Sequence, residues 1–201
     1  MQVVVLTNEC LKEELLNGVE TIEADVVWIE NISQLQQYQN ADAIIDLLYD
    51  ESHQPILENL LPALIIINSV EQTLQETNNS FIRINGWNTF LRSSIIEASV
   101  AKEENKAKAQ EVFSLFNKNL EWLPDAVGFI TPRVISMIIN EAFIALKEGV
   151  STKEDIDTAM KLGTNYPYGP FEWAEKIGVR RVESLLNKLS QEQTRYPLHL
   201  V

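Results

Sequence analysis

The sequence has one cysteine, Cys10, among its 201 residues. One cysteine excludes an intramolecular disulfide and a zinc site built from cysteines. Basic residues are also scarce, because 16 Lys and Arg stand against 29 Asp and Glu, giving a formal net charge of −13. Phosphate binding needs concentrated positive charge, so this balance disfavours nucleic acid and anionic membranes as partners. Any site for a polyanionic ligand must therefore be local.

Long apolar runs are missing as well. No stretch is long or apolar enough to span a bilayer, and no positively charged start precedes an apolar segment. We therefore expect neither a transmembrane segment nor a secretory signal, and we expect a cytoplasmic location. Hydrophobic residues still make up 45% of the sequence, which is enough to bury the cores of one or two small domains.

Short apolar runs alternate with helical segments in the first part of the chain. The runs that predict strands are 3–6, 26–29, 43–48, 64–67, 81–84, 95–100 and 122–123. The segments that predict helices or helical turns are 10–16, 33–38, 55–61 and 102–117. Apolar runs without strict alternation are typical of a parallel sheet covered on both faces. We predict an α/β fold, with a small, doubly wound, mostly parallel sheet over residues 1–123 and an all-α domain over residues 124–201.

The second part of the chain contains helices with clear end signals. Pro132 at a first helical position, with Thr131 as its cap, predicts a helix start, and Gly149 predicts its end. Apolar residues recur between them at helical spacing. Ser151 and Glu154 form a candidate capping box for a second helix ending at Gly163.

An aromatic and proline-rich loop follows the second helix. Each residue before a proline is biased towards extended geometry, so the segment 166–170, YPYGP, is expected to present its tyrosines on a stiff loop. A third helix is predicted from Phe171 to Ile177, with Gly178 ending it.

Three stretches of this region carry a resemblance to a known family: GFITPRV, INEAFIALKEGVSTKEDIDTAMKLG and YPYGPFEWAEKIGV. They resemble the carboxy-terminal domain of the 3-hydroxyacyl-CoA dehydrogenase family. The resemblance weakens towards Ala41, and it implies that the first domain is a Rossmann-like, dinucleotide-binding domain. It also implies an NAD-dependent dehydrogenase of acyl-CoA and fatty-acid metabolism that self-associates through its helical domain.

The turn after the first strand departs from a dinucleotide-binding pattern. Such a turn uses glycine so that backbone amides can approach the pyrophosphate at a helix start. Residues 7–11 read TNECL, without glycine, and Glu9 puts a carboxylate near the phosphate position. Glu30 is either the counterpart of the family's ribose-binding acid or a solvated residue. We therefore predict that no cofactor binds, and that NAD binding by the usual route is lost.

Residues 81–100 resemble the family stretch that holds a catalytic histidine, an asparagine three residues later and a glutamate twelve residues after the histidine. The resemblance implies that the histidine takes the proton from the substrate hydroxyl while the glutamate orients the imidazole, roles that suit a group titrating near neutral pH. In this sequence the glutamate is Glu97 and the asparagine is Asn88, but Asn85 stands at the histidine position. We predict that the site lacks its base.

Two more positions of the implied substrate pocket are substituted. Asn68, Ser69 and Val70 align with the family's asparagine, threonine and serine, so Val70 stands where the family has a hydrogen-bonding serine. Pro132 stands where the family has an asparagine facing the reacting carbon. Independent drift could produce three such substitutions in a single site, but the loss of one shared function is the simpler explanation.

Other groups could act in this region. His53, at the end of the third predicted strand, is either a candidate base at the ligand-binding edge or a solvated helix start. His199, in the tail, is expected to be exposed. Tyr168 and Trp173, in and beside the aromatic loop, could contact an acyl or pantetheine chain, or they could fill the core.

Three functions remain open from the sequence. The favoured one is a non-catalytic binding or assembly protein with a site for an acyl-CoA-like ligand, forming a homodimer, or a heterodimer with an active relative, through the helical domain. The second is an active NAD-dependent 3-hydroxyacyl-CoA dehydrogenase with altered site residues. The third is an enzyme of different chemistry that uses Glu97 and His53.

Overall fold

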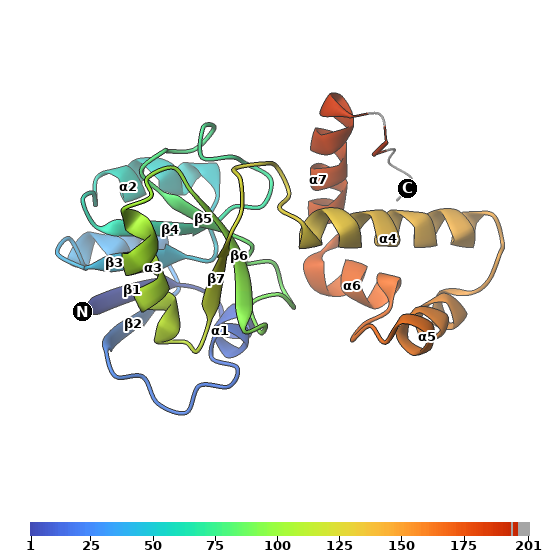
Figure 1. Ribbon diagram of the computed structural model, residues 1–201, viewed down its shortest axis with the longest axis horizontal. Coiled ribbons are helices and arrows are strands. Elements are labelled where there is room, and N and C mark those ends of the chain that lie inside the picture. The colour runs from blue at the N-terminus through green and yellow to red at the C-terminus, as the bar shows by residue number, and fades with distance from the viewer. Residues whose placement is uncertain (194, 197–201) are drawn as a thin grey trace. The chain divides into compact units, whose positions relative to one another are not determined.

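The computed structural model describes residues 1–193, 195 and 196. The chain divides into two compact units, one ending at Phe129 and one beginning at Ile130. We call residues 1–129 the sheet unit and the residues from Ile130 onward the helical unit, and we describe each by itself (Figure 1).

The sheet unit is built on a seven-stranded sheet with the order β2-β1-β3-β4-β5-β6-β7. The strands are β1 Gln2–Leu6, β2 Asp25–Ile29, β3 Ala43–Asp46, β4 Leu64–Asn68, β5 Ile82–Ile84, β6 Ile95–Val100 and β7 Asn119–Trp122. The pairs among β1 to β5 are parallel, β6 is antiparallel to β5, and β7 is parallel to β6. The mostly parallel, doubly wound sheet predicted from the sequence is confirmed.

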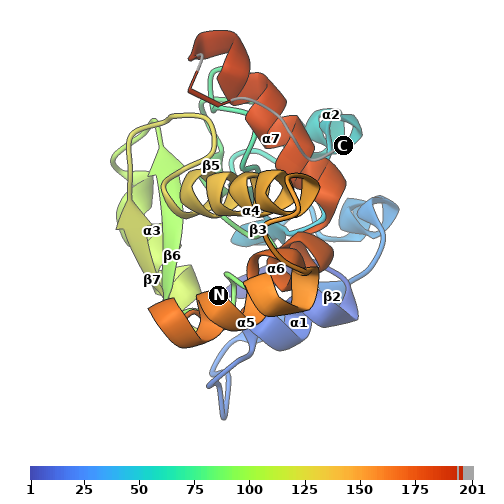
Figure 2. The same ribbon diagram turned by 90° about the vertical axis from the view of Figure 1, so that its right-hand side faces the viewer.

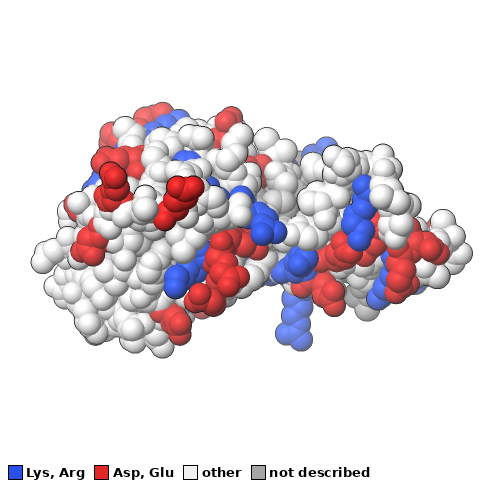
Figure 3. Space-filling view, turned by 90° about the horizontal axis from the view of Figure 1, so that it is seen from below, with Lys and Arg blue, Asp and Glu red and all other residues white. Residues whose placement is uncertain are grey.

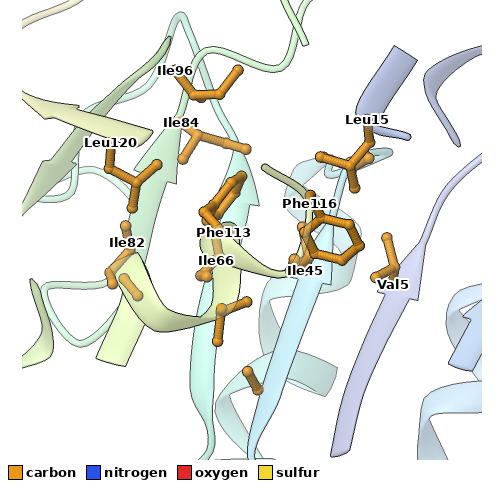
Figure 4. Packing of buried hydrophobic residues seen from close by; sticks show 14 of the residues in the cluster. Val5, Leu15, Ile45, Ile66, Ile82, Ile84, Ile96, Phe113, Phe116 and Leu120 are labelled. Carbon is orange, nitrogen blue, oxygen red and sulfur yellow. The ribbon is translucent and has the colours of Figure 1, made fainter. Parts of the chain in front are cut away.

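Helices cover both faces of this sheet. They are α1 Glu9–Leu15, the 3-10 helices η1 Ile32–Gln37 and η2 Glu51–His53, α2 Gln54–Glu58 and α3 Asn105–Ser114. Val3 and Val5 of β1 pack into the cluster under α1 and α3, which holds Phe113 and Phe116 (Figure 4), whereas Val4 and Leu6 pack into the cluster under η1 and α2. Burial on both faces explains why the strands read as unbroken apolar runs.

Four elements of the sheet unit are shorter than predicted. Helix α2 spans Gln54–Glu58 where the sequence predicted 55–61, and β5 starts at Ile82, one residue after the predicted start. We expected the third strand to reach Leu48, but β3 ends at Asp46, because the Asp46 carboxylate accepts the Leu48 N–H at 2.9 Å and turns the chain. The predicted helix over 102–117 spans only Asn105–Ser114. The chain forms turns directly before and after it, at residues 103–104 and 115–117.

The boundary between the units lies beyond the expected one near Pro124. The buried side chain of Arg83 explains the difference, because it ties the following segment to the sheet. Its Nη1 donates to Asp125 Oδ1 at 3.0 Å, its Nη2 donates to the Ala126 carbonyl at 2.7 Å, and the guanidinium lies 4.2 Å from the ring centroid of Phe129. These contacts place residues 125–129 in the sheet unit.

The helical unit contains α4 Thr131–Lys147, α5 Lys153–Thr164, α6 Pro170–Ile177 and α7 Val179–Glu192 (Figure 2). Helix α4 packs against α6 and α7, and α5 packs against α6. We made no prediction for α7 from the sequence. Its buried residues recur at helical spacing: Val182, Leu185, Leu186 and Leu189.

The helix ends differ from the prediction by one residue in four places. Helix α6 starts at Pro170, one residue before the predicted start at Phe171. Ile130 already has helical backbone angles and its carbonyl accepts the Val134 N–H, so α4 starts at Thr131 without a side-chain cap. Thr152, not Ser151, caps α5, because its extended backbone points its hydroxyl at the Asp155 N–H. Helix α5 continues through Gly163 and ends before Asn165, whose φ of 57° is left-handed.

Surface charge is mixed where it can be seen. On the face in Figure 3, basic side chains stand among acidic ones. Among the described residues, no helix is long and apolar enough to cross a membrane.

Candidate functional site

Asn85 and Glu97 lie opposite each other at the carboxyl end of β5. In the antiparallel register, Ile84 pairs with Ala98, so the next pair is Asn85 with Glu97, and the Asn85 N–H donates to the Glu97 carbonyl at 2.9 Å. The side chains also meet, with Asn85 Nδ2 donating to Glu97 Oε2 at 3.0 Å. The twelve-residue spacing thus becomes a direct contact. A carboxamide holds the glutamate here, but it cannot take up a proton in the useful pH range.

Asn68, at the end of β4, is committed to the backbone around it. Its Nδ2 donates to the carbonyls of Leu47 and Gly86, each at 3.0 Å, and its Oδ1 accepts the Gly86 N–H at 2.9 Å. A Cβ on Gly86 would lie 2.7 Å from the Asn68 side chain, so only glycine allows this approach. Asn68 therefore fastens the loop that begins at Asn85.

The remaining predicted pocket residues of the sheet unit are Ser69, Val70 and Asn88. Two of them form hydrogen bonds within the chain, and the third is apolar. Ser69 is buried and its hydroxyl donates to the Gln72 carbonyl at 3.0 Å. Val70 is buried and offers no polar side-chain atom. Asn88 Nδ2 donates to Cys10 Sγ at 3.4 Å.

The turn after β1 leads into α1 without a glycine. Asn8 caps α1, because its Oδ1 accepts the Leu11 N–H at 3.0 Å, and Glu9 lies in the first helical turn. A phosphate bound there would compete with the Asn8 side chain for the amide and would face the Glu9 carboxylate. Glu30 follows β2 and is exposed, and its backbone N–H donates to Gln34 Oε1 at 3.2 Å.

His53 lies near a partner that we did not predict from the sequence. Its Nδ1 is 2.7 Å from Oδ2 of Asp46, which is fully buried. An aspartate inside the apolar run AIIDLL was the available signal, because buried carboxylates need partners. His199 lies outside the described residues.

The predicted site residues of the helical unit are Pro132 and the loop aromatics. Pro132 is buried in the first turn of α4 and has no N–H to donate. Tyr166 and Tyr168 contact buried Trp173 edge-on, with ring centroids at 5.3 and 6.2 Å, and the Lys176 ammonium lies 4.8 Å from the Tyr168 ring centroid. These contacts favour the core-packing role of the loop aromatics.

Asp157 explains the glycine of the YPYGP loop and was missed from the sequence. Its carboxylate accepts the N–H groups of Phe171 at 2.8 Å and Glu172 at 3.3 Å, at the start of α6. A Cβ on Gly169 would collide with the same carboxylate. The loop therefore fits only when residue 169 is glycine.

An apolar groove of about 590 Å³ opens in the helical unit. Its lining residues come from α4, α5, the start of α6 and the chain beyond α7: Arg133, Val134, Met137, Ile138, Glu141, Ala142, Ala145, Ile156, Met160, Pro170, Arg195 and Tyr196. Val134 is 50% exposed although it is apolar.

Comparisons with known proteins agree with this organisation. Residues 128–199 match the family described as 3-hydroxyacyl-CoA dehydrogenase, C-terminal domain. The chain is 41% identical over 96 residues to a 3-hydroxyadipyl-CoA dehydrogenase of Escherichia coli, covering 48% of this chain and 20% of that protein. It is 34% identical over 111 residues to a 3-hydroxybutyryl-CoA dehydrogenase of Clostridioides difficile, covering 52% of this chain and 39% of that protein.

Solved structures extend the likeness to the whole fold. The chain superposes on the (S)-3-hydroxybutyryl-CoA dehydrogenase of Ralstonia eutropha with a TM-score of 0.74 and 18% identity, covering 99% of this chain and 90% of the other. This likeness shows the fold, a Rossmann-like sheet followed by a helical domain. Over residues 128–199 the chain carries a 3-hydroxyacyl-CoA dehydrogenase C-terminal domain. The matched segments span only a fifth to two fifths of the curated relatives.

Proposed function

We propose that this chain is a family member that has lost hydride transfer and serves in acyl-CoA metabolism as an assembly protein. The observation that carries the proposal is the Asn85 side chain, which is 3% exposed and donates to Glu97 at 3.0 Å. A proton acceptor for a substrate hydroxyl belongs at this position, and a carboxamide has no such capacity. The cytoplasmic location stays a prediction.

The other polar groups of the sheet unit support the same conclusion. The carboxamide of Asn68 makes three hydrogen bonds to backbone groups, and the hydroxyl of Ser69 is bound to a carbonyl. A substrate would have to displace these contacts. Val70 and Pro132 add no donor to the pocket that the family resemblance implies.

We propose further that NAD does not bind by the usual route. Asn8 and Glu9 support this, because the first occupies an amide of α1 and the second places a carboxylate in its first turn. The active NAD-dependent enzyme remains the competing function. It requires both an unusual base and an unusual phosphate site.

The assembly surface that we propose is the groove on α4, and its occupant is α4 of a second copy. Arg133 and Glu141 stand four residues before and four residues after Met137 on this helix. A two-fold axis at Met137, with the helices antiparallel, places Arg133 of each copy against Glu141 of the other and pairs the apolar faces between them. Self-complementary charge flanking an apolar centre is what an isologous interface needs.

Charge reversal tests the dimer. Sedimentation equilibrium of the unmodified chain should give a dimer. Arg133→Glu should weaken it by about tenfold or more, because two like-charge pairs replace two attractive ones. The double variant Arg133→Glu with Glu141→Arg should restore the dimer. A monomeric unmodified chain, or a double variant no tighter than the single one, contradicts the proposed surface.

Ligand binding is tested separately on the same protein. Thermal stabilisation by acetoacetyl-CoA without turnover would add an acyl-CoA site to the assembly role, and no stabilisation would leave assembly alone. Dimerisation only after mixing with an active relative would point to the heterodimer and would contradict the self-paired α4 arrangement. Turnover with NADH would contradict the proposed loss of catalysis.

A further inference from the structure

Asp46 is a buried carboxylate at the carboxyl end of β3. It is 0% exposed, and each of its oxygens has a partner. Oδ1 accepts the Leu48 N–H at 2.9 Å, and Oδ2 lies 2.7 Å from His53 Nδ1. Burial raises the pKa of Asp46, against the opposing effect of His53. The carboxylate therefore depends on the imidazole for its charge compensation.

His53 stands between this buried carboxylate and an exposed one. Its Nε2 is 3.5 Å from Oδ2 of Asp50, whose other oxygen accepts the N–H of Ser52 at 2.8 Å. The hydrogen bond that the imidazole donates to Asp46, opposed by partial burial, raises the pKa of His53. The side chain of Asp46 thus contacts the backbone of Leu48 and the ring of His53, near the two ends of the segment 47–53.

This segment borders the edge where ligands bind in an open parallel sheet. Strands β1 and β3 are neighbours, and β2 lies on the other side of β1, so the strand order reverses between β1 and β3. The Leu47 carbonyl is also one of the acceptors of Asn68, which fastens Gly86 beside Asn85. The segment 47–53 therefore connects the reversal point to the loop that carries the family's former base position.

We propose that Asp46, His53 and Asp50 form a protonation-dependent latch that fastens residues 47–53 over the carboxyl edge of β3. The imidazolium compensates the buried carboxylate and closes the latch. When His53 loses its proton, the Nδ1–H can still donate to Asp46, but the charge of the carboxylate is no longer compensated. The segment then opens more readily. This inference is independent of the assembly role.

The direction of the pH dependence follows from two shifts with the same sign. The pKa of His53 is raised above 6.5, and that of Asp46 is raised above 3.8, so the folded latch binds more protons than the unfolded chain. Its stabilisation is complete below pH 6.5 and is lost as pH rises through the raised pKa of His53. Tyr49 titrates well above this range, because burial and the neighbouring carboxylates raise its pKa to about 12.

The charged groups around the imidazole come from three elements. Asp46 belongs to β3, and Asp50 and Glu51 belong to the turn that forms η2. The Tyr49 ring contacts the imidazole edge-on, with ring centroids 6.4 Å apart. The negative charges of Glu51, in η2, and Glu58, in α2, help to raise the pKa of that tyrosine. Asp46 makes the main contribution because it is closest and fully buried.

A proton NMR titration tests the latch, because His53 and His199 are the only histidines and a His199→Gln variant assigns the signals. We expect His53 to titrate above 6.5. Asp46→Asn should lower its midpoint clearly, and the matched control Asp50→Asn should lower it less, since Asp50 is solvent-screened. A His53 midpoint at or below 6.5, or a larger effect of Asp50→Asn, would overturn the proposal.

Amide hydrogen exchange tests the opening itself. After correction for the intrinsic pH dependence, protection of the Leu48 amide should fall several-fold as pH passes the His53 midpoint in the unmodified chain. His53→Gln should remove this step and should also cover the case in which Asp46→Asn fails to fold. A pH step of equal size in His53→Gln, or none in the unmodified chain, would exclude the latch.

Discussion

The two units differ in what they have kept. The family match over residues 128–199 falls on the helical unit. There the carboxylate of Asp157 caps α6 beside the aromatic loop, and an apolar groove opens along α4. In the sheet unit the strands and their cores are intact, but Asn85, Asn68 and Ser69 are bound to groups of the same chain. The proposed loss of catalysis is compatible with an intact fold, because the buried core and the polar residues at the strand ends are separate sets of side chains.

The largest expected effect comes from the core of the sheet unit. Phe113→Ala should lower the free energy of unfolding by about 3–5 kcal/mol, because it removes a fully buried ring from the cluster under α3. Urea denaturation followed by fluorescence measures the change. The control Lys108→Ala on the exposed side of the same helix should change stability by about 0.5 kcal/mol at most. Similar losses of stability for the two variants would show that the buried face of α3 contributes no more to stability than its exposed face.

A smaller effect is expected in the helical unit. Gly169→Ala should destabilise by about 1–3 kcal/mol, because the added methyl group collides with the carboxylate of Asp157 that caps α6. Gly163→Ala is the matched control, since a Cβ there meets open space within α5, and it should stabilise by about 0.5–1 kcal/mol. Thermal unfolding compares them. Equal signs for the two substitutions would contradict the close approach.

The smallest effects are expected at the site of the sheet unit. Asn68→Ala should cost about 1–2 kcal/mol, because it leaves backbone groups of Leu47 and Gly86 without their partner. Asn88→Ala removes only a weak contact with Cys10 at 3.4 Å and should cost about 0.5 kcal/mol or less. Denaturant unfolding measures both. A larger loss for Asn88→Ala would show that the site is not organised around Asn68.

The sequence predicted much of the fold because the physical signals were local. Apolar runs buried on both faces located each strand to within about three residues of its ends. The caps were misplaced by one residue, since Ser151 and Thr152 both offer a hydroxyl and the backbone conformation decides between them. The boundary was misplaced because Arg83 reaches forward 42 residues to Asp125.

The site was predictable only in part. The Asn85 and Glu97 pair followed from the family resemblance, and the antiparallel register of β5 and β6 brings these residues together. The contact between Asp46 and His53 depends on how the chain turns after β3, which no local pattern of residues specifies. The role of Asp157 likewise depends on the packing of α5 against α6.

The central claim is that the chain transfers no hydride. The direct measurement is NADH oxidation with acetoacetyl-CoA, together with NADH binding by fluorescence, on the unmodified chain and on Asn85→His. We expect no saturable NADH binding and no turnover by either protein, because the turn after β1 and Pro132 are unchanged in the variant. Steady turnover by the unmodified chain would contradict the account, and turnover gained by Asn85→His alone would show that only the base had been lost.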